Sequence, residues 1–274
     1  MGATKKVALS GASGKVGSIL RTELLRRGVD LRSAGGSPPL DPLAPDEDIL
    51  HGDLRDPTVV DRLLTGVDVL IHMAGTAVEA PLDVVIENNL RAVREVYEGA
   101  RRHDVRRVVF ASSNHAFGMY PVTHKLRLDC EYRPDGMYGL SKVWGEAIAR
   151  LYWDKHGIES ICARIGTVTA GNRPTQPRHL CTWLGNEDLV QLVLRCIAAE
   201  NVGFMTVWGV SNNTRSYWEN TGAERLGFMP QQNAEDYAEE ILSRPNPLST
   251  IAQQYQGGSL AALDLTRGSG TEVD

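Results

Sequence analysis

Short apolar runs alternate with amphipathic stretches along the first part of the chain. The runs are rich in Val, Ile, Leu and Ala, and they predict strands at residues 5–10, 30–34, 48–51, 67–72, 108–112 and 160–164. Hydrophobic positions that recur every three or four residues predict helices at residues 15–27, 57–64, 84–103 and 138–156. Strands this apolar indicate a parallel sheet that is buried on both faces. We therefore expect an α/β fold with a doubly wound parallel sheet of the Rossmann type.

The pattern changes after residue 165. Residues 166–184 show no clear period, and a loop of this length inside a compact domain usually has a function. Beyond it the sequence predicts a helix at 186–199, a strand at 203–210 and a late helix at 234–242. We expect one domain over residues 1–274, in which 1–165 mainly bind a dinucleotide, 166–256 mainly bind substrate and 257–274 form a mobile tail.

The composition narrows the classes of function. Hydrophobic residues make up 42% of the 274 positions and charged residues 23%, which excludes a disordered or coiled-coil chain. The net charge of -5 argues against nucleic acid and anionic membranes as partners, since both attract basic proteins. Without an apolar run long enough to span a bilayer or a signal-peptide pattern, we expect a cytoplasmic enzyme. The four cysteines form no CxxC pair and no histidine pair has ligand spacing, so we expect no metal site.

A glycine-rich turn, GASGKVG at residues 11–17, follows the first predicted strand and opens the first predicted helix. In that setting a GxxGxxG motif cradles the pyrophosphate of a dinucleotide on the helix N-terminus. Gly11 provides the tight turn, Gly14 the close approach of backbone to the phosphates and Gly17 the close packing of helix on strand. The residues expected to bind the cofactor here are Gly11, Ser13, Gly14, Lys15, Val16 and Gly17.

The ribose end of the site lacks its usual signal. An Asp or Glu is expected at the end of the second strand to bind the ribose hydroxyls, but this chain has Gly35 within the run SAGGS. NAD is the expected cofactor, with NADP left open because Arg32 or Lys15 can attract a 2′-phosphate. Asp53, after the third strand, either accepts a hydrogen bond from the adenine amine or caps the next helix.

Tyr138 and Lys142 form a YxxxK pair one helical turn apart on the same helix face. A free tyrosine has a pKa of about 10, which is too high for a base at neutral pH. An ammonium group next to the phenol stabilises the phenolate, so we expect Lys142 to lower the pKa of Tyr138 toward the working range. Two serines, Ser112 and Ser113, end the fifth predicted strand, at the edge where parallel sheets bind ligands.

These motifs resemble the extended short-chain dehydrogenase/reductase superfamily from about residue 7 to residue 256. In that superfamily a serine, a tyrosine and a lysine are catalytic, and the aromatic–glycine pair at residues 117–118 aligns Ser113 with the serine, beside Tyr138 and Lys142. The resemblance also implies a homo-oligomer. The further cofactor contacts it implies, beside Tyr138 and Lys142, are Asp53, Leu54, Ala74, Gly75, Asn89 and Ile165. For Asn89 a purely structural buried amide is the alternative.

Further segments are similar to the uronate dehydrogenases within that superfamily, namely residues 110–115, 133–139, 164–166, 178–183, 207–211 and 256–258. This similarity implies oxidation of the anomeric carbon of a hexuronic acid, such as glucuronate or galacturonate, with NAD to an aldaric lactone. The implied substrate contacts are Ser113, Asn114, His115, Thr167, Arg178 and Thr76. Arg178 is assigned to the substrate carboxylate, because a guanidinium fork matches a carboxylate with two hydrogen bonds. Ala77 stands where those enzymes have a substrate-contacting serine.

Other interpretations remain open at this point. Arg178 also suits a sugar phosphate or a sulfonated hexose, and it can instead pair with a nearby acid. His115 can be a loop histidine that only binds backbone. A nucleotide-sugar epimerase is a further alternative, although the segment after residue 165 is short for nucleotide recognition. A dinucleotide sensor without turnover is disfavoured, since such a protein does not need the YxxxK pair.

Overall fold

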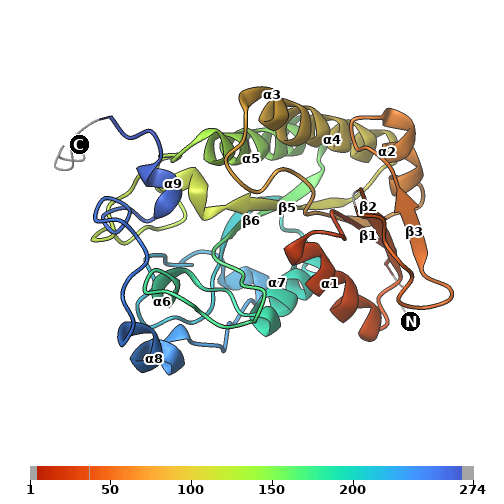
Figure 1. The fold of residues 1–274 in the computed structure, drawn as a ribbon. Coiled ribbons are helices and arrows are strands. Elements are labelled where there is room, and N and C mark those ends of the chain that lie inside the picture. Colours follow the sequence, from red (N-terminus) through yellow and green to blue (C-terminus); the bar gives the residue numbers. More distant parts are fainter. Residues whose placement is uncertain (1–4, 37, 267–274) are drawn as a thin grey trace.

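The computed structural model describes residues 5–36 and 38–266, and these contain a single parallel sheet (Figure 1). The seven strands lie in the order β3-β2-β1-β4-β5-β6-β7, and every neighbouring pair is parallel. Their bounds are β1 (Val7–Ser10), β2 (Leu31–Gly35), β3 (Asp48–His51), β4 (Val69–His72), β5 (Arg107–Ser113), β6 (Glu159–Ile165) and β7 (Phe204–Gly209). The predicted doubly wound sheet is confirmed. The chain order reverses between β1 and β4, which is where such sheets bind ligands.

Helices cover both faces of the sheet (Figure 1). The longer ones are α1 (Lys15–Arg26), α2 (Pro57–Leu64), α4 (Ala92–Arg102), α5 (Met137–His156) and α7 (Asn186–Ala198). Helices α1 and α7 pack in one core with alternate residues of the strands, and α2, α4 and α5 pack in the other. Because both faces are covered, the central positions of β1, β4, β5 and β6 are mostly apolar, which explains why their runs were visible in the sequence.

Local signals set several helix ends. Helix α2 begins where the Asp56 carboxylate accepts a hydrogen bond from the Thr58 backbone N–H at 2.8 Å, with Pro57 at its first position. The helix predicted at 84–103 is a composite of α3 (Leu82–Val85), a π-helical segment η1 (Ile86–Arg91) and α4. A π-helical turn inside a helix is rare and often marks a functional site.

The segment after β6 contains short elements that periodicity did not predict. Helix α6 (His179–Thr182) lies inside the predicted loop, and α9 (Ser259–Ala262) lies inside the predicted tail. The predicted late helix consists of a 3-10 turn η4 (Ala234–Tyr237) followed by α8 (Ala238–Leu242), and further 3-10 turns are η2 (Asn114–Phe117) and η3 (Glu224–Leu226). Helices this short have too few turns to show a hydrophobic period. The end of the predicted mobile tail, 267–274, lies outside the described residues.

The substrate-side portion has cores of its own. One joins Phe117 after β5 to Trp208 on β7 and to Trp218, whose ring stacks on Trp208 at 5.0 Å. Another joins α6, η4 and α8 around Trp183. Within the described part of the chain, none of the helices has the length and apolar character that crossing a membrane requires. In the same residues, no group of three or more His, Cys, Asp or Glu side chains is gathered as metal ligands would be.

Candidate active site

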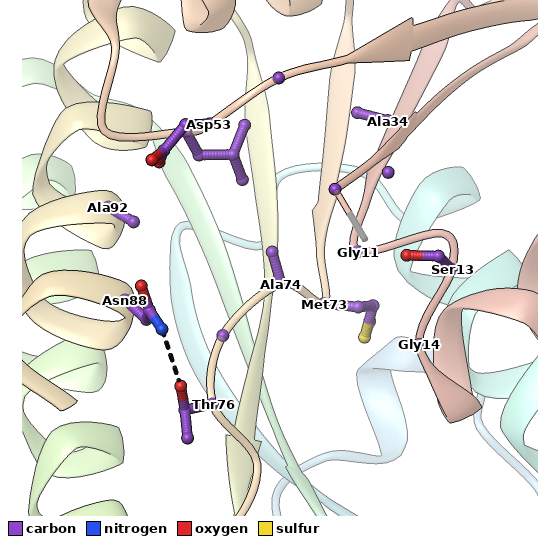
Figure 2. A pocket seen from close by; sticks show the side chains of 15 residues that line it. Gly11, Ser13, Gly14, Ala34, Asp53, Met73, Ala74, Thr76, Asn88 and Ala92 are labelled. Atoms are coloured by element: carbon purple, nitrogen blue, oxygen red, sulfur yellow. Dashed lines mark hydrogen bonds between the residues drawn. The ribbon is translucent and has the colours of Figure 1, made fainter. Parts of the chain in front are cut away.

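The carboxyl ends of the strands border two adjoining cavities. The first, of about 730 Å³, lies at the glycine turn and the ends of β2, β3 and β4 (Figure 2). Its lining residues are Gly11, Ser13, Gly14, Ala34, Gly35, Gly36, Gly52, Asp53, Leu54, Met73, Ala74, Gly75, Thr76, Asn88 and Ala92. We call it the dinucleotide cavity, because it lies at the edge of the sheet at which the strand order reverses.

The second cavity, of about 350 Å³, lies at the ends of β5 and β6 and shares Gly11, Gly14, Met73 and Gly75 with the first. We call it the substrate cavity. Its remaining lining residues are Lys15, Val16, Gly17, Ala77, Ala111, Ser112, Ser113, Asn114, His115, Tyr138, Lys142, Ile165, Gly166, Thr167, Val168 and Arg178. The fold thus brings together in this cavity every predicted catalytic residue and every predicted substrate residue except Thr76.

The glycine turn has the geometry that its motif predicts. Gly11 has a φ of +73°, and a Cβ on Gly17 would lie 2.0 Å from the Gly11 carbonyl oxygen, so neither position has room for a side chain. Helix α1 begins behind Gly14 without a side-chain cap and has no acidic residue in its first turn. Its uncapped N–H groups and the positive end of its dipole border the cavities, an arrangement that suits the pyrophosphate of a dinucleotide.

The ribose end of the dinucleotide cavity is formed by small residues. Ala34, Gly35 and Gly36 line it after β2. The Arg32 guanidinium points elsewhere: its Nε donates to Asp48 at 2.7 Å and its Nη1 donates to three carbonyl groups at the end of α2. The expectation that Arg32 attracts a 2′-phosphate is therefore wrong, because Arg32 lines neither cavity and its Nε and Nη1 are held by Asp48 and the end of α2. Lys15 lines the substrate cavity instead of this end.

Asp53 lines the same cavity from the segment after β3 (Figure 2), and so does Leu54 beside it. The Asp53 carboxylate accepts from the Arg55 Nε at 2.9 Å, and this hydrogen bond holds the pKa of Asp53 below its usual value. The alternative that Asp53 caps the next helix is wrong, because Asp56 is the cap. Asp53 thus keeps a charged, half-exposed carboxylate at the rim of the dinucleotide cavity.

Asn89 is placed behind the cavity wall. Its Oδ1 accepts from the Thr76 backbone N–H at 2.7 Å, and its Nδ2 donates to the Thr76 carbonyl and to the Ser141 hydroxyl, both at 2.9 Å. Both amide hydrogens are used within the protein, so Asn89 holds the loop after β4 against α5 instead of contacting the cofactor itself. Asn88, one residue earlier, lines the cavity and donates to the Thr76 hydroxyl at 3.0 Å. Thr76 therefore faces the dinucleotide cavity and not, as expected, the substrate, whereas Ala77 lines the substrate cavity.

The catalytic candidates come from two neighbouring elements. Ser113 ends β5, while Tyr138 and Lys142 lie on successive turns of α5, which packs directly on β5. All three are buried, with exposed fractions of 4%, 8% and 7%. The Lys142 Nζ lies 5.5 Å from the centre of the Tyr138 ring and 5.2 Å from that of Phe110. The ammonium group thus lies within range of favourable interaction with both aromatic rings.

Burial is the main cause of the pKa shifts of Tyr138 and Lys142. It raises the pKa of Tyr138, and a hydrogen bond with the Ser113 hydroxyl acts in the opposite direction. Burial also lowers the pKa of Lys142 to about 8. The expectation that Lys142 lowers the pKa of Tyr138 is thus wrong for the chain by itself. Burial destabilises the phenolate by more free energy than the neighbouring groups restore through their interactions with it. The same burial strengthens every electrostatic interaction between this group and a bound ligand.

His115 and Asp135 form a hydrogen-bonded pair beside the tyrosine. The His115 Nδ1 lies 2.6 Å from an Asp135 carboxylate oxygen, and the imidazole centre is 5.7 Å from that of Tyr138. The alternative in which His115 binds only backbone is wrong, since a buried carboxylate orients its ring toward the cavity. Gly118 and Gly257 leave room for that carboxylate, because a Cβ at either would lie within 2.0 Å of its Oδ2.

Arg178 reaches the substrate cavity from the turn before α6. Its Nε donates to the Gln256 carbonyl at 2.7 Å and its Nη1 to the Thr167 hydroxyl at 3.2 Å. With the Asn114 amide turned to satisfy both of its ends, the Asn114 oxygen accepts from Nη2 at 2.9 Å. All three partners are uncharged, and no carboxylate of residues 5–36 or 38–266 pairs with Arg178. The alternative of an arginine paired with a nearby acid is therefore wrong, and burial lowers the pKa of the unpaired guanidinium.

Sequence reasoning missed two acids that support the site. Asp135 lies in a segment quoted only for its similarity to other enzymes. Glu146 lies one turn beyond Lys142 on α5, where it is 1% exposed and accepts from the Ser112 hydroxyl at 2.5 Å and from Arg164 at 2.9 Å. The i, i+4 spacing after Lys142 was the available signal, since an acid on the buried face of a helix needs a partner.

Comparison of the chain with protein families gives a match that includes both the glycine turn and the YxxxK pair. Residues 7–217 match the NAD dependent epimerase/dehydratase family. The chain belongs to this family. In this chain the glycine turn and the YxxxK pair lie at adjoining cavities.

Among members of the family, the chain is 37% identical to a uronate dehydrogenase from Pseudomonas putida over 257 residues, which is 93% of this chain and 95% of the relative. A solved structure of a mutant uronate dehydrogenase from Agrobacterium tumefaciens in complex with NAD superposes with a TM-score of 0.89, at 37% identity, over 95% of this chain and 98% of that one. An NAD-dependent glucose-6-phosphate dehydrogenase from Haloferax volcanii is 34% identical over 85% of this chain and 96% of the relative.

Proposed function

We propose that this member of the epimerase/dehydratase family oxidises the anomeric carbon of a hexuronic acid with NAD and releases an aldaric lactone. The observation that carries the proposal is Arg178: an unpaired guanidinium lines the same cavity as Ser113, Tyr138 and Lys142. A buried cation without a carboxylate partner favours an anionic ligand, because the anion restores the interaction that burial removed. The similarity to two uronate dehydrogenases supports the same substrate class.

The dinucleotide cavity fits the cofactor by its shape and by its charge. Gly11 and Gly17 leave the turn bare of side chains, and α1 presents an uncapped end toward the cavity. Gly14, Ser13 and Val16 would lie along the pyrophosphate, and Asp53 and Leu54 along the adenosine end. Because neither Arg32 nor Lys15 lines the dinucleotide cavity, the described residues favour NAD over NADP. When bound, NAD supplies the acceptor for the hydride that leaves the anomeric carbon.

The chain's own groups handle the proton. Ser113 and Tyr138 bind the oxygen of the anomeric hydroxyl, and Tyr138 as phenolate takes its proton while the carbon–oxygen double bond of the lactone forms. The Lys142 ammonium lies 5.5 Å from the centre of the Tyr138 ring and adds a positive charge to the buried site in which the phenolate forms. His115, oriented by Asp135, donates or accepts at a sugar hydroxyl through its Nε2. Thr167 and Arg178 hold the carboxylate end of the sugar, which fixes the distance to the reacting carbon.

A substrate panel tests the proposal. We expect absorbance of reduced nicotinamide to rise when the protein is mixed with NAD and either glucuronate or galacturonate, and to rise much less with the matching neutral hexoses. A signal with glucose 6-phosphate but with neither acid would instead favour a sugar-phosphate dehydrogenase. Conversion of a nucleotide sugar without accumulation of reduced cofactor would favour an epimerase, and binding of NAD without any turnover would favour a sensor.

We also propose that copies of the chain associate through α5. Leu140, Trp144 and Leu151 recur along this helix and are 49%, 41% and 43% exposed, so an apolar row faces outward. Rows of this kind on a helix usually meet a partner. Analytical ultracentrifugation of the wild type and of Trp144→Asp checks the proposal, which requires the mass of the variant to fall toward that of one chain.

A further inference from the structure

Counting the hydrogen bonds of Arg178 shows what is left for a ligand. A guanidinium has five N–H donors. Three are engaged, one each by the Gln256 carbonyl, the Thr167 hydroxyl and the Asn114 amide oxygen. Two donors therefore remain, one on each terminal nitrogen, which is the pair that a carboxylate takes with its two oxygens. The backbone carbonyl of Gln256 is the partner of Nε, so it fixes the orientation of the guanidinium plane relative to the rest of the cavity.

The backbone carbonyl of Gln256 is held in place by the hydrogen bonds of its own side chain and backbone N–H. The side chain is 1% exposed, its Oε1 accepts from the Trp218 indole at 2.8 Å, and its Nε2 donates to the carbonyls of Pro121 at 3.1 Å and His124 at 2.8 Å. Its backbone N–H donates to the Tyr120 carbonyl at 2.9 Å. Every polar group of the residue is thus bonded, so the carbonyl that meets Arg178 has little freedom to move.

Gly258 lets the same segment pass close to the arginine. It has a φ of +65°, and a Cβ there would lie 2.7 Å from the Arg178 Cδ and 2.9 Å from its Nε. A side chain at this position would displace the aliphatic part of Arg178. The segment Gln256–Gly258, which the sequence singled out without a function, therefore contacts Arg178 through both ends.

We propose that Gln256 is a positioning residue that gives the enzyme its preference for acidic sugars. By holding Nε of Arg178, it pre-orients the two free donors toward the substrate cavity, and Gly258 provides the space for that arrangement. Gln256 lines neither cavity, and its contact with a substrate-cavity side chain is the hydrogen bond from the Arg178 Nε to its backbone carbonyl. This inference rests on the proposed function in one respect only, namely that the anion which Arg178 binds is a sugar carboxylate.

The first test is Gln256→Met, which keeps the length of the side chain and removes its hydrogen bonds. At saturating NAD we expect KM for a hexuronate to rise about tenfold, kcat to change by less than about threefold, and KM for the matching neutral hexose to stay within about twofold, because only ground-state anion binding is lost. Equal rises of KM for the acid and the neutral sugar would overturn the inference, as would a loss confined to kcat.

A second variant guards against misfolding of the first, since Gln256→Met leaves the Trp218 indole without its partner. Gly258→Ala pushes directly on Arg178, and Gly66→Ala is its matched control, with a φ of +72° and nothing within 4 Å of the added Cβ. Both positions have a positive φ, but the ψ of -128° at Gly258 lies outside the left-handed helical region, so the melting temperatures of both variants are compared before KM is interpreted. We expect Gly258→Ala to raise KM for the hexuronate about tenfold and Gly66→Ala to leave it unchanged. Equal effects in the two variants would contradict the positioning role.

Binding of a hexaric acid separates this inference from the proposed function. A hexaric acid carries carboxylates but no anomeric carbon, so calorimetry with the NAD-loaded protein measures anion recognition without turnover. We expect the Kd to rise about tenfold in Gln256→Met relative to wild type. If hexuronates are not oxidised but this rise is found, the proposed function fails and the positioning role of Gln256 stands. If hexuronates are oxidised and the Kd is unchanged, the positioning role is wrong.

Discussion

The dinucleotide cavity and the substrate cavity offer different kinds of hydrogen-bond donor to an anionic ligand. The first uses backbone: seven consecutive residues, 11–17, form a bare turn and an uncapped helix end. The second uses one side chain, Arg178, whose donors are oriented by groups from three distant segments, one of them 78 positions away. A backbone site is made by local conformation, whereas an arginine site exists only after the chain has folded around it. The two should therefore respond to mutation independently.

The largest effect is expected at Tyr138, and it should leave both recognition sites intact. Tyr138→Phe removes the phenol that accepts the substrate proton, and general bases typically contribute a factor of about 10³ to kcat. We expect a loss of that size in steady-state assays, with the Kd for NAD, measured by fluorescence titration, unchanged. A large change in that Kd would show that the chemical group and the dinucleotide cavity are not separable.

Arg178→Ala should affect the substrate cavity alone. Removing the guanidinium should raise KM for a hexuronate by about 10²-fold, because a buried charge-assisted hydrogen-bonded pair is worth about 2–5 kcal/mol, and it should hardly alter KM for the neutral hexose. Arg150→Ala is the control, since Arg150 pairs with Asp154 on the exposed side of α5. Similar increases for the acid and the neutral sugar would count against a carboxylate at Arg178.

The pH profile tests the electrostatics of the buried pair at the substrate cavity. Activity needs Tyr138 without its proton and Lys142 with its proton, and burial raises the pKa of Tyr138 while it lowers that of Lys142 to about 8. Below pH 8 the phenolate fraction grows about tenfold per pH unit; above pH 8 the loss of ammonium offsets that growth. We expect kcat/KM to rise and then level near pH 8, and the break near pH 8 to disappear in Lys142→Met. A wild-type profile that levels below pH 7 would refute this assignment.

The smallest effects are expected from alanine substitutions in the glycine turn, where Gly14 and Gly17 should respond differently. A Cβ on Gly17 would lie 2.0 Å from the Gly11 carbonyl, whereas a Cβ on Gly14 would meet only that oxygen, at 3.3 Å. We expect Gly17→Ala to lower the melting temperature and weaken NAD binding together. Gly14→Ala should keep the melting temperature and weaken NAD binding about tenfold, because the added methyl lies where the pyrophosphate approaches. Unchanged NAD affinity in Gly14→Ala would place the pyrophosphate elsewhere.

Most of the fold was predictable because its signals are local. The apolar runs of β1, β4, β5 and β6 identify buried parallel strands, and Asp56 with Pro57 marks the start of α2. The exceptions have physical reasons. The helix at 84–103 contains the π-helical segment η1, where the tertiary contacts of Asn89 hold the helix between Thr76 and Ser141. Short elements such as α6 are held by packing around Trp183 and carry no period of their own.

The site was predictable as a set of residues but not as a set of roles. Thr76 and Ala77 are adjacent in the chain, yet they line different cavities, because a one-residue step in an extended segment reverses the side chain's direction. Asn88 and Asn89 also point in different directions, because they are successive residues of the π-helical segment η1, and of the two only Asn88 lines a cavity. The effect of Lys142 on Tyr138 was misjudged because the balance between charge and burial depends on how much water reaches the phenol.

By itself, the sequence determined the parallel sheet, the glycine turn and the presence of a tyrosine–lysine pair on one helix face. Each of these follows from neighbours within a few positions, where backbone conformation and spacing decide the outcome. Only the tertiary structure decided that Arg178 pairs with no acid of residues 5–36 or 38–266, that Asp135 orients His115 and that Gln256 holds Arg178. These relations join segments far apart in the chain, and hydrogen bonds act over about 3 Å, so they exist only once folding has brought the partners into contact.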